Sequence, residues 1–554
     1  MDDKLFIIAI GGTGMRCLEA FVHLCAAGMF DNKTIDILTL DTDQSNGNKA
    51  RVEGLIDLYN RIKTSDNSHE GGDSSANTFF SAKLNLFRFY TEYSEAERKT
   101  LKNLINTRTN TPENREDNRD LTDLFFDNNV QEFPLDHGYR AQTHLGSMLM
   151  YHGILEAAIK AKKGSKDVKD NDKELQEFIQ LLYHNSANAR VFVFGSVFGG
   201  TGASSIPVIP IALRDALKVL MEGKKELNLN KVMFGSTLLT DYFKFDLPDD
   251  QQRKKDRVIA DASNFALNSQ AALNFYNSDI TVKQSYKRLY HIGWPASLKI
   301  DYSQGQAGND VITGGKEQQN PCHVVELMCA AAAYDFFTTD DMKQPEAKYL
   351  YRSVEEGEGN KLRLTGASFV GEKDGLILEQ KLGTMLSLAH LILSRYNGAQ
   401  EGTDGTIEFL EDIKKRNVEN YADIKDEQAR QLDEYLKIYA YSIKNGQLAP
   451  GWLHQVKNTI DGSFIFSDEA LSLETSILNK VDPGAIYKDE KYNWQEAGLF
   501  GKKADKRFDK FIEVFKSDDS NPTLDQGNSL KEKFLGHLYK AITKTQKTPH
   551  TNRG

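Results

Sequence analysis

Cysteine is scarce in this sequence, and the spacings that would give its few cysteines a chemical role are missing. The 554 residues contain 4 cysteines, which is too few for a disulfide framework, and none is paired in the Cys-x-x-Cys spacing of zinc sites. Cys17 and Cys25 fall on one expected helix and Cys322 and Cys329 on another. Their spacings are close to whole turns, so each pair is expected to face a core. Reduced thiols in a cytoplasmic protein are the resulting expectation.

Long apolar runs and a nucleoside-triphosphate P-loop are also missing. No apolar stretch reaches the ~18–20 residues that span a bilayer, and residues 1–4 lack the basic start and long apolar run of a signal peptide. We therefore expect no membrane span and a cytoplasmic location. The segment closest to a Walker motif, residues 313–317, lacks both the upstream glycine and the Ser or Thr after lysine.

A concentrated basic surface is not evident either. The chain has 69 Lys and Arg against 79 Asp and Glu, a formal net charge of −10, which argues against a general nucleic-acid-binding protein. A basic cluster from Lys540 to Arg553 is interpreted as a solvated tail. The apolar share of 40% and the aromatic share of 10% are those of a globular protein, and at ~100–200 residues per domain the chain should form two to four domains.

Strands and helices are expected to alternate along the first 340 residues. Buried strands of a parallel sheet are predicted at residues 5–10, 35–40, 191–198, 231–239 and 289–292. Helices are predicted at residues 15–29, 79–104, 143–162, 257–274 and 321–337, with a further helix that has Pro207 in its first turn. This alternation predicts an α/β fold with a doubly wound, mostly parallel sheet.

The rest of the chain has a different pattern. Polar compositions predict mobile surface loops at residues 64–77 and 110–120. Residues 376–396 and 406–444 are predicted to be helical. We therefore divide the chain into a nucleotide-binding domain, residues 1–340, and a C-terminal region, residues 341–554. The C-terminal region is expected to be largely helical or α+β and to serve assembly or partner binding.

Two glycine-rich turns, Gly11-Gly12-Thr13-Gly14 and Gly199-Gly200-Thr201-Gly202, each lie between a predicted buried strand and a predicted helix. Such a turn exposes backbone N–H groups at the positive end of a helix dipole, where an anionic phosphate binds favourably. Glycine allows the close approach and the positive φ that such a turn requires. Two such turns at the same edge of one sheet can hold a polyphosphate from two sides.

The second turn and its flanks resemble the signature loop of the tubulin/FtsZ superfamily, Gly-Gly-Gly-Thr-Gly-Ser-Gly. Here Phe198 stands in place of the first glycine, and Ala203-Ser204 stands in place of Ser-Gly. Further segments are similar in order: the first glycine turn, Asp41-Thr42-Asp43, the stretch 138–143 where a γ-phosphate loop belongs, and Asn320 near the start of the expected core helix. The resemblance covers residues 1–340 and is greatest to the divergent bacterial tubulin-like proteins.

The resemblance implies a GTP- or GDP-binding protein with Mg²⁺, and it assigns roles to particular residues. The nucleotide-binding residues it implies are Gly11, Gly12, Thr13, Gly14, Asp41, Thr42, Asp43, Arg140, Gln142, Gly199, Gly200, Thr201, Gly202, Ala203, Ser204 and Asn320. Arg140 and Gln142 would lie near the γ-phosphate, and Asn320 would contact guanine. Asp43 would act near the metal through water, with no direct protein ligand.

The resemblance also implies self-assembly and GTP hydrolysis. Subunits of this family assemble head to tail, a heterologous contact that can propagate into filaments. Acids after the core helix then reach the nucleotide of the next subunit. Asp340 and Asp341 are the candidates here, although the segment 338–343 lacks the asparagine of the family pattern.

Two other functions remain open. One is a non-polymerising nucleotide-binding adaptor that recruits a protein partner through its C-terminal half. The other is a Rossmann dinucleotide-dependent enzyme, in which Asp41 would bind the ribose. The first glycine turn lacks the Gly-x-Gly-x-x-Gly fingerprint of that fold, and a dinucleotide fold leaves the turn at Gly199 unexplained.

Overall fold

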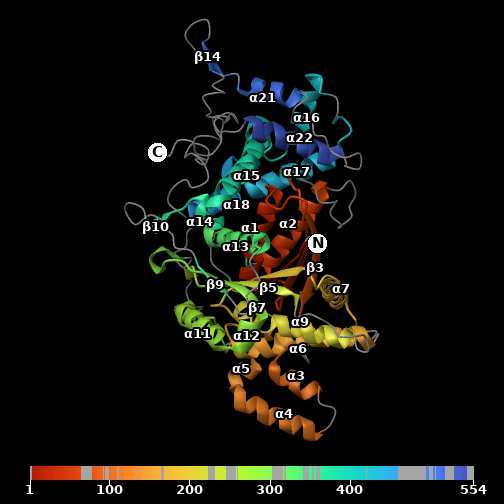
Figure 1. Cartoon of the computed structure of the whole chain (residues 1–554), viewed down its shortest axis with the longest axis vertical. Helices are drawn as coiled ribbons and strands as arrows, with labels where there is room; N and C mark the ends of the chain where they lie inside the picture. Colours follow the sequence, from red (N-terminus) through yellow and green to blue (C-terminus); the bar gives the residue numbers. More distant parts are fainter. Residues whose placement is uncertain are drawn as a thin grey trace.

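A seven-stranded, all-parallel sheet forms the centre of the computed structural model of the chain (Figure 1). The structure describes residues 3–545 except for 64–77, 92, 94–98, 109–111, 136–137, 164–167, 222–230, 245–257, 259, 302–315, 317, 319, 341–347, 352–354, 357–361, 419–420, 460–494, 498–502, 506 and 518–529. The strands are β1 (Lys4–Ile10), β2 (Thr34–Asp41), β3 (Lys83–Tyr90), β4 (Ala189–Phe194), β5 (Met233–Leu239), β7 (Tyr286–Ile292) and β9 (Lys348–Leu350). The predicted α/β class with a parallel sheet is confirmed.

The strand order is β3-β2-β1-β4-β5-β7-β9. The chain first builds outward from β1 to β3, then returns to the other side of β1 to place β4. The order therefore reverses between β1 and β4, which is the topological switch point of a doubly wound sheet. Crevices outside the carboxyl ends of the strands at this point are the usual ligand sites of open α/β sheets.

Strand β1 is buried on both faces, which accounts for its continuous apolar sequence. Leu5, Ile7 and Ala9 belong to one hydrophobic core, and the alternate residues Phe6, Ile8 and Ile10 belong to a second core. Successive side chains of a strand point to opposite faces, so the two cores are the two sides of the sheet.

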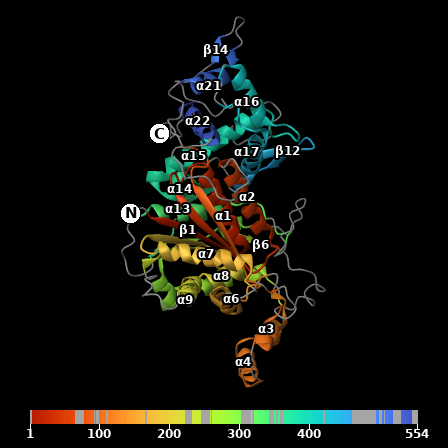
Figure 2. The same cartoon turned by 90° about the vertical axis from the view of Figure 1, so that its right-hand side faces the viewer.

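Helices cover both faces (Figures 1 and 2). Helices α1 (Gly11–Ala26), α2 (Gly47–Lys63) and α13 (Val324–Thr338) contribute to the first core. Helices α6 (Thr143–Lys163), α7 (Asp170–His184) and α9 (Ile209–Leu220) contribute to the second. The arrangement is the three-layer α/β architecture in which each apolar helix stripe is buried against the sheet.

Helices from the C-terminal region continue the layer of α1 and α2 away from the sheet, and some of them contact α1 or α2 directly (Figure 2). They are α14 (Gly366–Val370), α15 (Glu372–His390), α16 (Gly405–Lys415), α17 (Asp426–Tyr439), α18 (Trp452–Asn458), α21 (Arg507–Lys516) and α22 (Leu530–Thr545). Their buried side chains join the same core as those of α1, α2 and α13. One continuous core therefore extends past residue 340.

One stretch in this region is long and apolar enough, by composition alone, to cross a membrane. It spans Glu372–Arg395, and 78% of its most apolar window is buried inside the protein. Core helices of water-soluble proteins share these properties, and the burial accounts for the composition without a bilayer.

Several predicted boundaries were wrong. Residues 79–104, predicted as a helix, contain β3 and the start of α3 (Leu101–Arg108), because the leucines and phenylalanines of residues 84–89 form a short apolar run, which periodicity alone does not assign to a helix or a strand. Most of the predicted loop 110–120 is the start of α4 (Pro112–Phe125), whose charged residues are good helix formers and whose first position is a proline. The predicted loop 64–77 lies outside the described residues.

Two other helices also differ from the prediction. Residues 406–444 contain α16, α17 and then the strand β12 (Tyr441–Lys444), which pairs with β13 (Gln447–Pro450). Pro207 lies in the turn between α8 (Thr201–Ser205) and α9, and Pro210 instead occupies the first turn of α9.

The remaining helices and strands lie outside the central sheet. They are α5 (Asn128–Glu132), α11 (Phe265–Ser278), α12 (Ile280–Ser285), the two-stranded pairs of β6 (Phe243–Lys244) with β8 (Ile300–Asp301), β10 (Glu355–Glu356) with β11 (Leu362–Arg363), and β14 (Gln495–Ala497) with β15 (Lys503–Asp505).

We expect Trp452→Ala to destabilise the whole chain, because Trp452 is 1% exposed and its ring lies 4.6 Å from that of His23 on α1. Loss of a buried tryptophan should lower the free energy of unfolding by about 3–5 kcal/mol. Urea unfolding followed by circular dichroism should show one transition shifted to lower urea. The control Tyr351→Ala removes a side chain that is 80% exposed and should change little. Two separate transitions, only one of them shifted, would contradict a shared core.

Candidate functional site

The two glycine turns lie side by side at the switch point of the sheet. The first opens α1 directly after β1 ends at Ile10, and the second follows β4 and leads into α8. A Cβ atom added to Gly11 would lie 3.1 Å from Cβ of Thr201. Parallel pairing of β1 with β4 causes this contact, because it brings both carboxyl ends to the same edge.

Glycine is required at two of these positions for distinct reasons. Gly11 has φ +64°, a left-handed conformation that other residues rarely adopt. A Cβ on Gly200 would lie 2.7 Å from the backbone nitrogen of Ala141, so a side chain there would collide with a third loop. The glycines thus allow three backbone segments to approach one another.

Phe198, which departs from the signature loop, has a structural role. Its side chain is 3% exposed, and its ring lies 4.9 Å from that of Phe265, 5.7 Å from Phe243 and 6.3 Å from Tyr242. This aromatic cluster holds the residue before Gly199 in a fixed place, so the turn is anchored by packing at the position where the signature has glycine.

Ala203 and Ser204 contribute to the loop's support. The hydroxyl of Ser204 is fully buried and donates to the carbonyl of Thr201 at 3.0 Å. Tyr276 donates to the carbonyl of Ala203 at 2.5 Å. A Cβ on Gly146 of α6 would lie 2.5 Å from Oγ of Ser204, so this serine side chain packs against α6 and faces the protein interior.

Asp41, Thr42 and Asp43 follow β2 and are nearly inaccessible to solvent, at 2%, 1% and 2% exposure. Oδ1 of Asp41 accepts the backbone N–H groups of Thr42 at 2.7 Å and Asp43 at 3.3 Å. Burial and the neighbouring charge of Asp43 raise the pKa of Asp41 to about 7. Neither Oδ2 of Asp41 nor Oγ1 of Thr42 has a hydrogen-bond partner among the residues that the structure describes.

The stretch 138–142 closes a third side of the site. A Cβ on Gly138 would lie 3.7 Å from Oγ1 of Thr201 and 3.8 Å from Oγ1 of Thr42. Gly138, Arg140 and Ala141 all have positive φ, at +83°, +45° and +64°. Unusual φ values in non-glycine residues tend to occur at ligand sites, where the surrounding structure maintains them.

Arg140 and Gln142 differ in their contacts. Nη1 of Arg140 donates to the carbonyl of Val258 at 2.8 Å, and its guanidinium lies 5.8 Å from the ring centre of Phe133. The backbone N–H of Gln142 donates to the carbonyl of Tyr139 at 2.8 Å. Both residues are partly exposed beside the second glycine turn, and the contacts of Arg140 orient its side chain toward Val258.

A polar wall beside Gly12 was missed by the sequence reasoning. A Cβ on Gly12 would lie 3.2 Å from Oε1 of Gln318 and 3.4 Å from Nδ2 of Asn46. Asn46 donates to Gln318 at 2.7 Å, and its own oxygen accepts the N–H groups of Asn48 and Lys49 at the start of α2. An asparagine before a helix is a recognisable capping signal, but nothing local indicates its contact with Gln318.

Asn320 is brought to this wall, where its backbone makes several contacts. Its N–H donates to Oδ1 of Asn48 at 3.3 Å, and its carbonyl accepts from Arg16 and from Arg51. It precedes α13 by four positions and does not begin the helix, which is capped by His323.

A buried ion pair lies behind the first glycine turn. Nε of Arg16, on α1, contacts Oε1 of Glu326, on α13, at 2.6 Å, with side chains 2% and 1% exposed. Tyr242 donates to the same carboxylate oxygen at 2.8 Å. Arg51 of α2 contacts Glu19 of α1 at 2.5 Å. These pairs join α1, α2 and the segment that carries Asn320, so they orient the first turn relative to the polar wall.

Asp340 lies away from these residues. It is exposed, and the carbonyl of the preceding Thr339 accepts a hydrogen bond from Arg190, which lies at the start of β4. The glycine turn follows the other end of this strand, roughly 20 Å along the sheet at 3.3 Å per residue. Asp341 lies outside the described residues.

No group of three or more His, Cys, Asp or Glu side chains able to hold a metal ion occurs in the part of the chain that the structure describes. The four cysteines are buried and unpaired with one another by disulfides. A cation at the site would therefore need ligands beyond protein side chains, such as phosphate oxygens and water.

No family model matches the chain, and no curated protein matches it.

We expect Asp41→Asn to raise the melting temperature at pH 8 and to leave it unchanged at pH 4. The folded carboxyl titrates near pH 7, whereas an unfolded aspartate titrates near 3.9. Between these values the folded state binds more protons, so stability falls as the pH rises. Asparagine mimics the protonated form, so the variant should avoid this loss, which is about 1–4 kcal/mol.

Melting temperatures from pH 4 to 8 test this expectation. Asp120→Asn, on the exposed surface of α4, is the matched control and should follow the wild-type profile. Identical pH profiles for Asp41→Asn and the wild type would contradict it.

Proposed function

We propose that this chain binds a nucleoside triphosphate, GTP by its resemblance to the tubulin/FtsZ superfamily, and that it is a GTPase that assembles head to tail. The observation that carries the proposal is the close approach of the two glycine turns: a Cβ atom added to Gly11 would lie 3.1 Å from Cβ of Thr201. The polyphosphate would lie against Gly11–Gly14 from one side and against Gly199–Gly202 from the other.

The start of α1 supports phosphate binding. This helix has 16 residues, and no side chain caps its N-terminus. The first N–H groups of a helix have no partners within it, and the helix dipole adds about half a positive charge there. Gly12 and Thr13 are partly exposed at this end, so an anion can reach these N–H groups.

The acids after β2 support a Mg²⁺ ion at the same site. The residues present fit such an ion, because the Oδ2 of Asp41 and the Oγ1 of Thr42 are buried oxygens without partners in the described structure. A divalent cation would favour ionised Asp41 and Asp43 next to the phosphates. With Asp43 acting through water, Mg²⁺ would keep several water ligands, as it usually does, and would supply charge neutralisation for phosphoryl transfer.

The position of Asp340 supports hydrolysis completed by a second subunit. Asp340 lies at the amino end of β4 and the glycine turns lie at its carboxyl end, so this acid cannot reach the nucleotide of its own chain. In a head-to-tail contact the amino edge of one subunit faces the carboxyl edge of the next. Asp340 and Asp341 would then lie close to the neighbour's γ-phosphate and help to activate water.

A nucleotide-binding adaptor that does not polymerise is the second candidate. It shares the glycine-turn site, and the missing asparagine in the segment 338–343 favours it. Sedimentation distinguishes the two candidates: filaments that pellet with GTP but not with GDP support assembly, whereas a soluble, GTP-bound protein supports the adaptor.

Substitution of Thr201 should abolish nucleotide binding. We expect Thr201→Arg and Thr201→Glu each to weaken GTP binding by at least about 100-fold, or about 2.7 kcal/mol, because a long side chain at position 201 would crowd the turn that begins at Gly11. The positive charge of the arginine would attract phosphate and offset part of the loss of GTP affinity. The glutamate variant repels phosphate, so its loss of affinity is not offset in this way. Isothermal titration with GTP and ATP measures both affinities and the base preference.

Thr403→Arg is the control, since Thr403 is similarly half-buried but lies between α15 and α16. It should bind GTP like the wild type. Wild-type affinity in both Thr201 variants would place the nucleotide elsewhere.

Replacement of both Asp340 and Asp341 by alanine should slow GTP turnover by about 100-fold or more without changing GTP affinity. The acids belong to the neighbour's site, so binding to the chain's own loops is unaffected. Phosphate release at concentrations above and below assembly measures the effect, with Asp120→Ala as the control. Turnover equal to the wild type would remove these acids from the reaction.

A further inference from the structure

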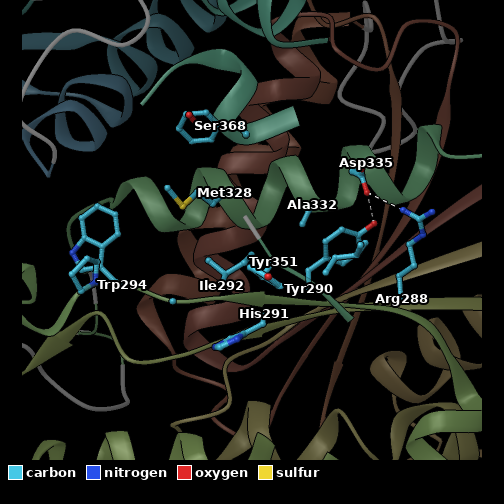
Figure 3. A pocket seen from close by; sticks show the side chains of 14 residues that line it. Arg288, Tyr290, His291, Ile292, Trp294, Met328, Ala332, Asp335, Tyr351 and Ser368 are labelled. Atoms are coloured by element: carbon cyan, nitrogen blue, oxygen red, sulfur yellow. Dashed lines mark hydrogen bonds and ion pairs between the residues drawn. The ribbon is translucent and has the colours of Figure 1, made fainter. Parts of the chain in front are cut away.

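A second concave site lies on the α13 side of β7, two strands away from β4 (Figure 3). Its cavity has a volume of about 460 Å³. The end of β7 and the segment after it form the floor, α13 and α14 form two walls, and the end of β9 forms the rim. None of its lining residues belongs to the glycine-turn site.

The lining is mostly aromatic and aliphatic. Met328 and Ala332 contribute from successive turns of α13, and Phe369 contributes from α14. Trp294 lies at the end of the cavity away from Asp335 and Arg288 (Figure 3), and its indole N–H is already satisfied by the carbonyl of Leu298 at 3.0 Å. The indole therefore offers its apolar ring to the cavity.

Polar groups are gathered at one end. Oδ2 of Asp335 accepts from the Tyr290 hydroxyl at 2.7 Å and from Nη1 of Arg288 at 3.2 Å (Figure 3). A carboxylate has about four acceptor positions, so Asp335 can also accept a hydrogen bond from a ligand. Apolar walls with a few polar groups at one place are typical of small-molecule sites of roughly 300–1,000 Å³.

The charges of the lining residues balance. Arg288 and Asp335 form an ion pair, and the ring of His291 points away from α13, to the other side of β7 (Figure 3). His291 therefore contributes no charge to the cavity. Because the charges of Arg288 and Asp335 neutralise each other, neither would compensate the charge of an ionic ligand. Burial of an uncompensated charge in an apolar cavity is costly.

We propose that this cavity binds a neutral, largely apolar aromatic molecule that carries one hydrogen-bond donor, with its rings between Trp294 and α13 and its donor at Asp335. The site is independent of the nucleotide proposed above, because it shares no residue with the glycine turns.

Binding can be tested on the full chain with N-phenyl-1-naphthylamine, a neutral two-ring-system aromatic amine whose fluorescence rises in apolar surroundings. We expect saturable binding with one site per chain. Met328→Trp and Ser368→Trp each place a large ring in the cavity from a different wall and should each weaken binding about tenfold or more. Melting temperatures identify a variant that fails to fold. In that case the affinity of the other cavity variant for the amine provides the test.

Phe275→Ala is the control for dye bound to exposed apolar surface, since Phe275 is 50% exposed on α11 and does not line the cavity. It should bind the amine like the wild type. Unchanged affinity in a folded cavity variant, or an equal loss in Phe275→Ala, would overturn the site.

The chemical class can be tested with a matched anion. 8-Anilinonaphthalene-1-sulfonate has the same aromatic skeleton with one added negative charge. We expect it to bind the cavity about tenfold more weakly or worse than the neutral amine, as measured by displacement of the amine. Equal or tighter binding of the sulfonate would overturn the assignment to neutral ligands. In the wild-type protein, fluorescence energy transfer from Trp294 to the bound amine reports that the two are close together. This transfer should fall in Trp294→Phe, while the amine still binds.

Discussion

The parallel pairing of β1 with β4 is the constraint on which the rest of the site depends. It aligns Leu5 with Arg190 and Ala9 with Phe194, so both strands end at the same edge, and the glycine turns that follow them meet. Neither turn would make a two-sided anion site alone. The strand order reverses at this pair, and such a switch point is where open α/β sheets usually bind their ligands.

A second constraint is the buried connection of α1 to α13 through Arg16 and Glu326. A buried ion pair is favourable only with good geometry and additional hydrogen bonds, and here Tyr242 and the carbonyl of Asn320 supply them. The connection places α13 between three features: its N-terminal segment contacts the glycine-turn site, its middle forms a wall of the apolar cavity, and its C-terminal end leads to Asp340.

The C-terminal helices complete the layer over α1. His23 of α1 is enclosed by Tyr435, Tyr439 and Trp452, and burial lowers the pKa of His23 to about 3. The imidazole is thus neutral at physiological pH and packs as an aromatic ring. The helix that would present phosphate-binding N–H groups is therefore held on one side by the sheet and on the other by the C-terminal region.

Local patterns in the sequence determined the buried strands, the glycine turns and most helices, because hydrophobic periodicity and glycine placement reflect forces that act over a few residues. They misassigned β3, whose short apolar run was interpreted as part of a helix, and α4, whose polar composition resembled a loop. The sequence also led us to expect the two glycine turns at the same edge of one sheet. Only the tertiary structure decided the partners of Asn46 and Arg16, the orientation of Arg140 and the apolar cavity. Arg16 and Glu326 are 310 positions apart, and such pairings arise from the packing of whole elements, which no local pattern encodes.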